Sequence, residues 1–320
     1  MKTVGLPISK KENEKRRAFT PEQLDIFPYK DHIFVEAGYG DVFHTSDEEL
    51  KNKGIHVVSR DIALQQDIIC DPKIGDESYI DTLKKGQIVF GWVHAVQHRE
   101  LTALLCKREL TVIAWEDMSE NGRHVFWKNN EIAGEAAVMH AFCYNGRFPS
   151  ETNAAIIGNG NTARGAFRAL TALGANVTVY NSKAESIFRK ELFDYDIIVN
   201  AVLWDLSRND HLVYESDLIK MKKNSMIIDI SCDEGKGIET SKATTIEEPV
   251  YEVNGIIHYV VDHTPALFYQ TASKSIGKEL LKFFPDLMND ALDTNVVLKN
   301  ATIIKSGVIL DHKIKEYQGV

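Results

Sequence analysis

Residues 154–180 read AAIIGNGNTARGAFRALTALGANVTVY, and this stretch decides the fold of the second half of the chain. An apolar run, a glycine-rich turn, a helix-forming segment and a second β-branched run follow one another in the order of a βαβ unit. The turn fits the pattern GxGxx(G/A), directly after a strand and at the start of a helix, where glycines let the backbone approach a pyrophosphate. We therefore predict a dinucleotide-binding turn, the alternative being a glycine turn that binds no ligand. The residues assigned to it are Gly158, Asn159, Gly160, Asn161, Thr162 and Ala163.

The end of the second strand of this unit bears on which dinucleotide binds. NAD-binding versions carry an acidic residue ~20 residues after the glycine turn, where it accepts hydrogen bonds from the ribose. Here the sequence reads Asn181, Ser182 and Lys183, which would not repel a 2′-phosphate. Lys183 can pair with such a phosphate, assisted by Arg164. We expect NADP(H); the alternative is that Lys183 simply begins a solvated helix.

Short apolar strands alternate with helical patterns along the rest of the chain. The runs in the first half are TVGLP, HIFVEAG, GIHVVS, DIIC, QIVFGWV and LTVIAW, and those in the second half include DIIVNAV, SMIIDIS and IIHYVVDH. Strands this apolar are typical of a parallel sheet covered on both faces. Helices are expected to begin at Thr20 and to occupy 76–85, 99–107, 130–144 and the region from His263 to about residue 280.

The length of 320 residues suits two domains, each with its own core. The helix at 130–144 leads into the nucleotide unit, and the apolar tail segment ATIIKSGVIL is expected to return to the first domain. We predict an α/β protein of two Rossmann-like domains with parallel sheets and the active site in the cleft between them. The first, substrate-binding domain is discontinuous (1–130 plus 270–320), and the dinucleotide-binding domain covers 131–269.

Composition and charge exclude several classes of protein. Hydrophobic residues make up 44% and charged residues 26%, as in an ordinary globular chain. The formal net charge of -9 opposes broad binding to nucleic acid or to anionic lipid. No apolar run approaches the ~20 residues of a membrane span, and the N-terminus lacks a signal-peptide core, so we expect a cytoplasmic protein.

The four cysteines, Cys70, Cys106, Cys143 and Cys232, lie far apart without CxxC or Cys/His spacing. That pattern favours buried free thiols over a disulfide framework or a zinc site.

Three titratable residues follow predicted strands of the first domain. Arg16 lies after TVGLP, Lys73 after DIIC and His94 after IVFGWV. Carboxyl ends of parallel strands are where ligands gather in open α/β sheets, and such a group can hold a carboxylate and move a proton. The alternatives are a solvated Arg16 in a basic run, an ordinary loop lysine, and a core histidine bonded to a carbonyl.

A series of short motifs identifies the family. They are VGLPISKKENEKRRAFTP at 4–21, DPK at 71–73, IVFGWVHAV at 88–96, AWE at 114–116, NEIAGEAA at 130–137, the glycine turn, NAVL at 200–203 and DISCDEGKGIE at 229–239. Together they resemble the alanine dehydrogenase and pyridine nucleotide transhydrogenase family, in order, over nearly the whole chain. The resemblance implies that Arg16 grips the substrate carboxylate, that Lys73 contacts the keto acid and that His94 is the acid/base residue. It places Asp233 beside nicotinamide and substrate.

Departures from that family pattern narrow the resemblance. VDHTPALF at 261–268 is similar to the segment of lysine-forming saccharopine dehydrogenases, and the chain is short between His94 and the glycine turn. With Asn181, these features resemble the carboxyethylornithine synthase branch, which joins pyruvate to the side-chain amine of ornithine. The resemblance implies NADPH, pyruvate and a basic amino acid (ornithine or lysine) as reactants and a homo-oligomer, either a dimer or a tetramer.

Two further acids, Glu116 and Asp262, are assigned to the substrate's α-ammonium, or else they cap a helix or support a neighbour. The resemblance also implies cofactor contacts by Ala201, Val202, Leu203, Ile230, Val261 and His263. The other functions considered are an alanine dehydrogenase that uses ammonia, a saccharopine-dehydrogenase-like oxidoreductase, and a nucleotide sensor without enzymatic activity. The joint presence of Arg16, Lys73, His94 and Asp233 argues against the sensor.

Overall fold

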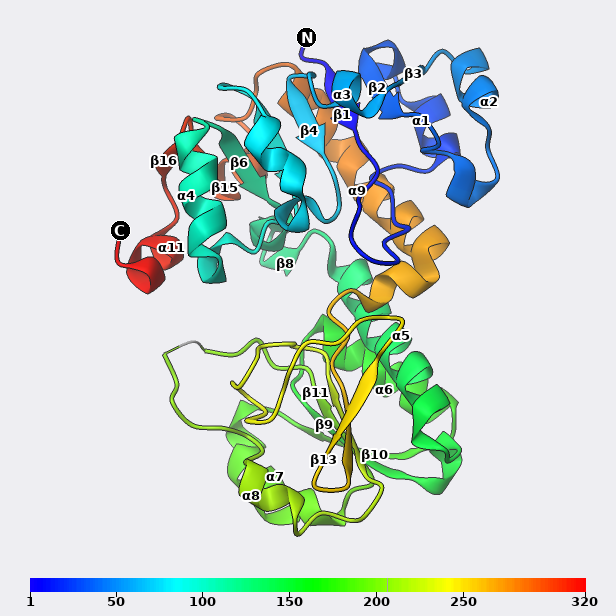
Figure 1. The fold of residues 1–320 in the computed structure, drawn as a ribbon, viewed down its shortest axis with the longest axis vertical. Helices are drawn as coiled ribbons and strands as arrows, with labels where there is room; N and C mark the ends of the chain where they lie inside the picture. The colour runs from blue at the N-terminus through cyan, green and yellow to red at the C-terminus, as the bar shows by residue number, and fades with distance from the viewer. Residues whose placement is uncertain (206) are drawn as a thin grey trace. The chain divides into compact units, whose positions relative to one another are not determined.

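The computed structural model describes residues 1–205 and 207–320 (Figure 1). The chain divides into two compact units. Unit 1 comprises Met1–Trp127 and Tyr269–Val320, and unit 2 comprises Lys128–Phe268. The boundaries expected from the sequence were 130/131 and 269/270.

Unit 1 is built on an eight-stranded sheet in the order β16-β15-β6-β5-β4-β1-β2-β3. Strands β1 to β6 are parallel, as predicted, and β15 and β16 add two antiparallel strands at one edge. The chain order 3-2-1-4-5-6 is that of a doubly wound nucleotide-binding sheet. The strands are β1 (Val4–Leu6), β2 (Ile33–Glu36), β3 (His56–Val58), β4 (Ile68–Cys70), β5 (Ile88–Gly91), β6 (Thr111–Ala114), β15 (Thr302–Lys305) and β16 (Val308–Ile309).

The helices of unit 1 begin where the sequence signals them. Thr20 accepts a hydrogen bond from the Gln23 backbone N–H and Gln23 reciprocates, which makes a capping box with Pro21 in the first turn of α1. The α-helices are α1 (Pro21–Ile26), α2 (Asp47–Asn52), α3 (Arg60–Ala63), α4 (Arg99–Lys107), α9 (Tyr269–Met288), α10 (Val296–Asn300) and α11 (His312–Gln318). A small hairpin of β7 (Ser119–Glu120) and β8 (Arg123–His124) follows β6.

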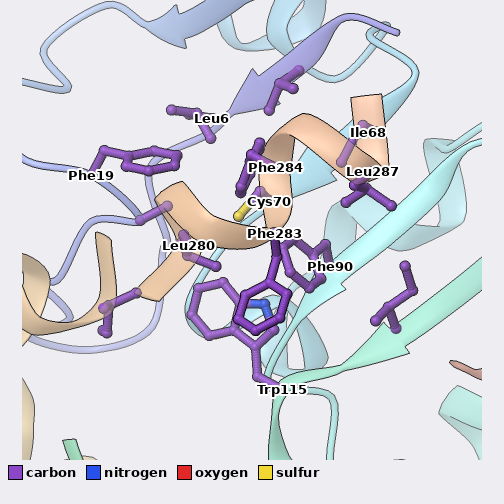
Figure 2. Packing of buried hydrophobic residues seen from close by; sticks show 14 of the residues in the cluster. Leu6, Phe19, Ile68, Cys70, Phe90, Trp115, Leu280, Phe283, Phe284 and Leu287 are labelled. Carbon is purple, nitrogen blue, oxygen red and sulfur yellow. The ribbon is translucent and has the colours of Figure 1, made fainter. Parts of the chain in front are cut away.

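The late helix α9 fills the core of unit 1 and explains why this unit needs both parts of the chain. Apolar residues recur along α9 at three- and four-residue spacing, so they share one face. Figure 2 shows that face packed against early residues, among them Phe19, Phe90 and Trp115. In Figure 1 the orange helix correspondingly lies beside the blue strand β1. The α9 residues labelled in Figure 2 are Leu280, Phe283, Phe284 and Leu287.

Unit 2 is built on a six-stranded sheet in the order β10-β9-β11-β12-β14-β13, parallel except for β13. The strands are β9 (Asn153–Ile157), β10 (Asn176–Tyr180), β11 (Ile197–Asn200), β12 (Met226–Asp229), β13 (Val250–Val253) and β14 (Ile256–Tyr259). The helices are α5 (Trp127–Asn145), α6 (Asn161–Ala172), α7 (Glu185–Glu191) and α8 (Glu215–Leu218). The helix from His263 begins as a 3₁₀ turn, Thr264–Phe268, and continues as α9.

Two expectations from the sequence are wrong. The predicted helix at 76–85 is absent; two 3₁₀ turns, Ile74–Asp76 and Ser78–Thr82, stand in that region. The cysteines are free thiols, as expected, but only Cys70 is buried, while Cys143 is exposed. In the described part of the chain, no helix is both long enough and apolar enough to cross a bilayer.

Candidate functional site

The site in unit 1 lies at the point where the strand order reverses. From β1 the chain proceeds outward through β2 and β3, then returns to the other side of β1 and continues through β4, β5 and β6. Ligands of open α/β sheets bind at the carboxyl ends of the strands at such a reversal. Arg16 follows β1, Lys73 follows β4 and His94 follows β5, so the three residues come from three adjacent strands.

Arg16 is buried, with only 3% of its surface exposed. Its Nε donates to Oε1 of Glu14 at 2.8 Å and its Nη2 to Oε2 at 2.5 Å, a two-point ion pair. The guanidinium carbon lies 5.2 Å from the ring centre of Trp92, two residues before His94. A charge this buried requires such partners, so the interpretation of Arg16 as a solvated surface charge is wrong.

Lys73 is also buried, at 6% exposure. Its Nζ lies 2.8 Å from Oδ2 of Asp76, and Nζ of Lys11 lies 3.2 Å from the same oxygen. Its backbone N–H donates to Oδ1 of Asp71 at 2.9 Å, and the Tyr79 hydroxyl donates to Oδ2 of Asp71 at 3.0 Å. Asp71 is fully buried, and this burial, with the nearby Glu77 carboxylate, raises the pKa of Asp71 to about 7.

His94 is exposed, which is inconsistent with a core histidine. Its backbone is left-handed, with φ 51° and ψ 37°. For a residue with a side chain, that conformation costs roughly 1–2 kcal/mol, so the surroundings must hold it. The Glu116 carboxylate does so: Oε1 accepts the His94 N–H at 2.5 Å and Oε2 accepts the Val93 N–H at 3.2 Å.

Two glycines bring the segments carrying Lys73 and His94 together. A Cβ on Gly91 would stand 2.0 Å from the carbonyl oxygen of Asp71. A Cβ on Gly75 would stand 2.3 Å from the carbonyl oxygen of Val93. Only glycine permits both approaches, so the ends of β4 and β5 lock backbone against backbone.

The glycine turn of unit 2 lies at the equivalent reversal, where β9 is flanked by β10 and β11. Gly158 has φ 123°, and a Cβ there would stand 2.6 Å from the carbonyl oxygen of Ala201. A Cβ on Gly160 would meet no described heavy atom within 4 Å, so open space lies before the start of α6. These features fit a dinucleotide: a tight turn, room for a pyrophosphate, and the N–H groups of a twelve-residue helix facing it.

Close packing behind this turn holds α6 in place. A Cβ on Gly165 would stand 1.9 Å from the Glu131 carbonyl oxygen, and a Cβ on Gly134 would stand 2.0 Å from that of Thr162. The backbones of α5 and α6 are therefore in direct contact. Ala163 is buried, in keeping with the small residue predicted there.

At the end of β10, the Asn181 side chain accepts the Lys183 backbone N–H at 3.0 Å and caps the turn that follows. Asn181, Ser182 and Lys183 are all exposed. Arg164, the second cation considered for a 2′-phosphate, lies 3.8 Å from Glu131 and donates to the Asn161 side chain. The exposed cation at this strand end is accordingly Lys183.

The other predicted cofactor contacts differ in exposure. Leu203 is 97% exposed, an uncovered apolar side chain just beyond Ala201, whereas Val261 packs into the core of unit 2. Val202 and Ile230 are half-buried. His263 is buried, and its Nδ1 lies 2.7 Å from Oδ1 of the partly exposed Asp262.

Family models match both parts of the chain. The N-terminal domain of "Alanine dehydrogenase/PNT" matches residues 5–133, and the C-terminal domain matches 161–316. A protein of Lactococcus lactis subsp. lactis named N(5)-(carboxyethyl)ornithine synthase is 31% identical over 294 residues, covering 87% of this chain and 93% of that protein. The chain belongs to the alanine dehydrogenase/PNT family.

Two further relatives of this family member agree in length. An N(5)-(carboxyethyl)ornithine synthase of Clostridium botulinum is 30% identical over 299 residues, covering 87% of this chain and 92% of that protein. The solved structure of an L-alanine dehydrogenase superposes with a TM-score of 0.84 at 23% identity and covers 99% of each chain. That structure supports the fold of both units.

Sequence reasoning missed a buried carboxyl of this family member at the end of β12. Asp229 is 1% exposed; its Oδ1 accepts Nδ2 of Asn200 at 2.9 Å and the Cys232 N–H at 3.3 Å, and its Oδ2 accepts the Ser241 hydroxyl. Burial raises the pKa of Asp229 to about 6. The backbone beside Asp233 is thereby held with Cys232 left-handed, at φ 55°. An acid closing the apolar run MIID was the signal available in the sequence.

Among the residues that the structure describes, no group of three or more His, Cys, Asp or Glu side chains is arranged to hold a metal ion.

Proposed function

We propose that this protein is an NADP(H)-dependent oxidoreductase that condenses pyruvate reductively with the side-chain amine of ornithine, or of lysine. The product is a carboxyethyl amino acid, a secondary amine of the opine type. The observation that carries the proposal is the convergence of Arg16, Lys73 and His94 on adjacent strand ends at the reversal of the unit 1 sheet. The ~30% identity to proteins named N(5)-(carboxyethyl)ornithine synthase supports the choice of reactants.

In unit 1, the keto acid meets two buried cations. Arg16 is fixed by Glu14 and Trp92, and Lys73 is fixed by Asp76, so the positive groups that receive the carboxylate are ordered beforehand. A fixed carboxylate fixes the adjacent carbonyl carbon, which lowers the entropic cost of the reaction.

Proton transfer is assigned to His94. The amine adds to the pyruvate carbonyl, and water leaves only when a proton reaches the hydroxyl of the adduct. An imidazole near its usual pKa of ~6.5 can donate that proton and recover one from the attacking nitrogen. The exposed His94 ring is suited to this exchange.

In unit 2, the dinucleotide is assigned to residues 158–163 with Lys183 toward a 2′-phosphate. When bound, the nicotinamide supplies the hydride that reduces the carbon–nitrogen double bond. Asp233 and Asp262 are assigned to the positively charged ends of the amine substrate. An oxidoreductase that uses ammonia, as the name alanine dehydrogenase says of a structural relative, is the second candidate.

The test compares amine substrates. NADPH oxidation should be rapid with pyruvate plus ornithine, slower with lysine and small with ammonium. If ammonium supports turnover as well as ornithine does, the protein is an alanine dehydrogenase. His94→Ala should lower turnover by about 10²–10⁴-fold with cofactor affinity unchanged. Arg16→Ala and Lys73→Ala should impair the use of pyruvate while leaving NADPH binding intact, because neither residue belongs to unit 2.

A further inference from the structure

The Glu116 carboxylate is committed to the backbone of one turn. Glu116 lies in the 3₁₀ turn Trp115–Asp117 that follows β6, next to β5 in the sheet. Its Oε1 accepts the His94 N–H at 2.5 Å and its Oε2 accepts the Val93 N–H at 3.2 Å. Bonds from N–H groups to an ionised carboxylate are about twice as strong as neutral ones.

That turn has little other freedom. The Val93 side chain is 1% exposed, and its carbonyl oxygen faces Gly75 at a distance that admits no Cβ. His94 then bends into the left-handed region, which non-glycine residues hold only when their neighbours fix them. The direction of the exposed imidazole consequently depends on the two peptide groups that Glu116 grips.

We propose that Glu116 is a positioning residue that aims the His94 imidazole by holding the backbone N–H groups of Val93 and His94. This inference rests on the proposed function, in which His94 moves the protons. It replaces the expectation that Glu116 binds the α-ammonium of the amino acid.

The test variant is Glu116→Gln, whose amide offers one acceptor oxygen where the carboxylate offers two. Its NH₂ group would face a backbone N–H, so one of the two bonds is lost. We expect kcat to fall by about 10- to 100-fold, because a displacement of ~1 Å can cost as much as 10²-fold. The KM values for ornithine and pyruvate should stay within about twofold, since no bond to either substrate is removed.

Asp117→Asn is the matched control. Asp117 lies in the same turn and pairs with Lys313 at 3.1 Å, so the control removes one carboxylate charge without touching the His94 turn. Amide hydrogen exchange of residues 93–94 should accelerate in Glu116→Gln and stay unchanged in Asp117→Asn. Glu116→Asp keeps the charge but shortens the reach, and it should accelerate the same exchange; it serves in place of the glutamine variant if that variant does not fold.

The double variant decides whether Glu116 acts through His94. In a His94→Ala background, Glu116→Gln should cause no further loss of turnover, because the group that Glu116 aims is gone. An additional loss of tenfold or more would overturn the proposal, as would a raised KM for ornithine with kcat preserved, which is the signature of an ammonium anchor. If His94→Ala alone is fully active, the proposed function fails, whereas exchange at 93–94 still tests whether Glu116 holds the turn.

Discussion

Replacing Asp71 by asparagine should stabilise unit 1 at alkaline pH and change little in acid. The Asp71 carboxyl is fully buried at the end of β4 and bonds to the Lys73 N–H and the Tyr79 hydroxyl. Asparagine keeps both bonds, because its Oδ1 still accepts the N–H while its Nδ2 donates to the hydroxyl oxygen. The substitution therefore removes a buried charge and little else.

The sign of the effect follows from the pKa of Asp71, which burial raises from 3.8 to about 7. Between these values the folded protein holds a proton that the unfolded chain releases, so the free energy of unfolding falls as pH rises. Above about 7 both states are ionised, and the whole penalty is present. At 1.36 kcal/mol per pKa unit, the shift corresponds to an upper bound of about 4 kcal/mol.

Urea unfolding at about pH 5 and about pH 8.5 tests this, read by tryptophan fluorescence. Trp92, Trp115 and Trp127 lie in unit 1 and Trp204 in unit 2, so the signal reports mainly on unit 1. The stabilisation by Asp71→Asn should appear only at the higher pH. A difference between variant and wild type that is the same at both pH values would refute the reasoning.

Asp76→Asn is a control of opposite sign. Burial raises the pKa of Asp76, but Lys73 and Lys11 outweigh it, and the net shift is downward. Ionised Asp76 thus adds stability that is present above its unfolded pKa and is lost as pH falls through the folded value. Asparagine there should destabilise at neutral pH.

The remaining predictions concern unit 2. Gly165→Ala places a Cβ 1.9 Å from the Glu131 carbonyl oxygen and should cost about 1–3 kcal/mol in thermal unfolding, whereas Gly160→Ala, with open space at its Cβ, should leave the melting temperature unchanged and weaken dinucleotide binding. Asn181→Asp should weaken the binding of NADPH more than that of NADH, and equal effects measured by titration would exclude this turn as the discriminator. Asp262→Asn should raise the KM for the amino acid more than that for pyruvate; unchanged steady-state kinetics would remove Asp262 from the amine site.

The order of strands and helices was predictable because each element carries its own local signal. Buried parallel strands appear as apolar runs and the helix at Thr20 as a capping box, and α4 occupies the predicted residues 99–107. The glycine turn was predictable for the same reason, since its pattern, the strand before it and the helix after it are contiguous in sequence.

The error at 76–85 arose because distant partners decide that segment. Glu77 is buried; its Oε1 accepts the Ser9 hydroxyl at 2.8 Å and the Lys10 N–H at 2.6 Å, and its Oε2 pairs with Arg60 at 3.1 Å. These bonds and the inward turn of Tyr79 break the chain into two 3₁₀ turns despite its helical pattern. Propensity describes a segment alone, whereas tertiary hydrogen bonds override it.

Buried carboxylates were the larger omission, and they share one task. Each accepts the backbone N–H of a residue proposed to act on substrate or, at Asp229, of the residue before it. The pairs are Glu14 with Arg16 at 2.9 Å, Asp71 with Lys73 at 2.9 Å, Glu116 with His94 at 2.5 Å and Asp229 with Cys232 at 3.3 Å.

This shared task has a physical cause in the fold. Where a buried strand ends, the next N–H groups lose their ladder partners yet remain shielded from water, so each must find another acceptor. A carboxylate supplies a strong one and also offsets the positive charge that a keto-acid site gathers from Arg16 and Lys73. In sequence, such an acid beside a strand end looks like a catalytic group. In the structure its oxygens are occupied by the backbone, and the chemistry falls to the side chains that it holds in place.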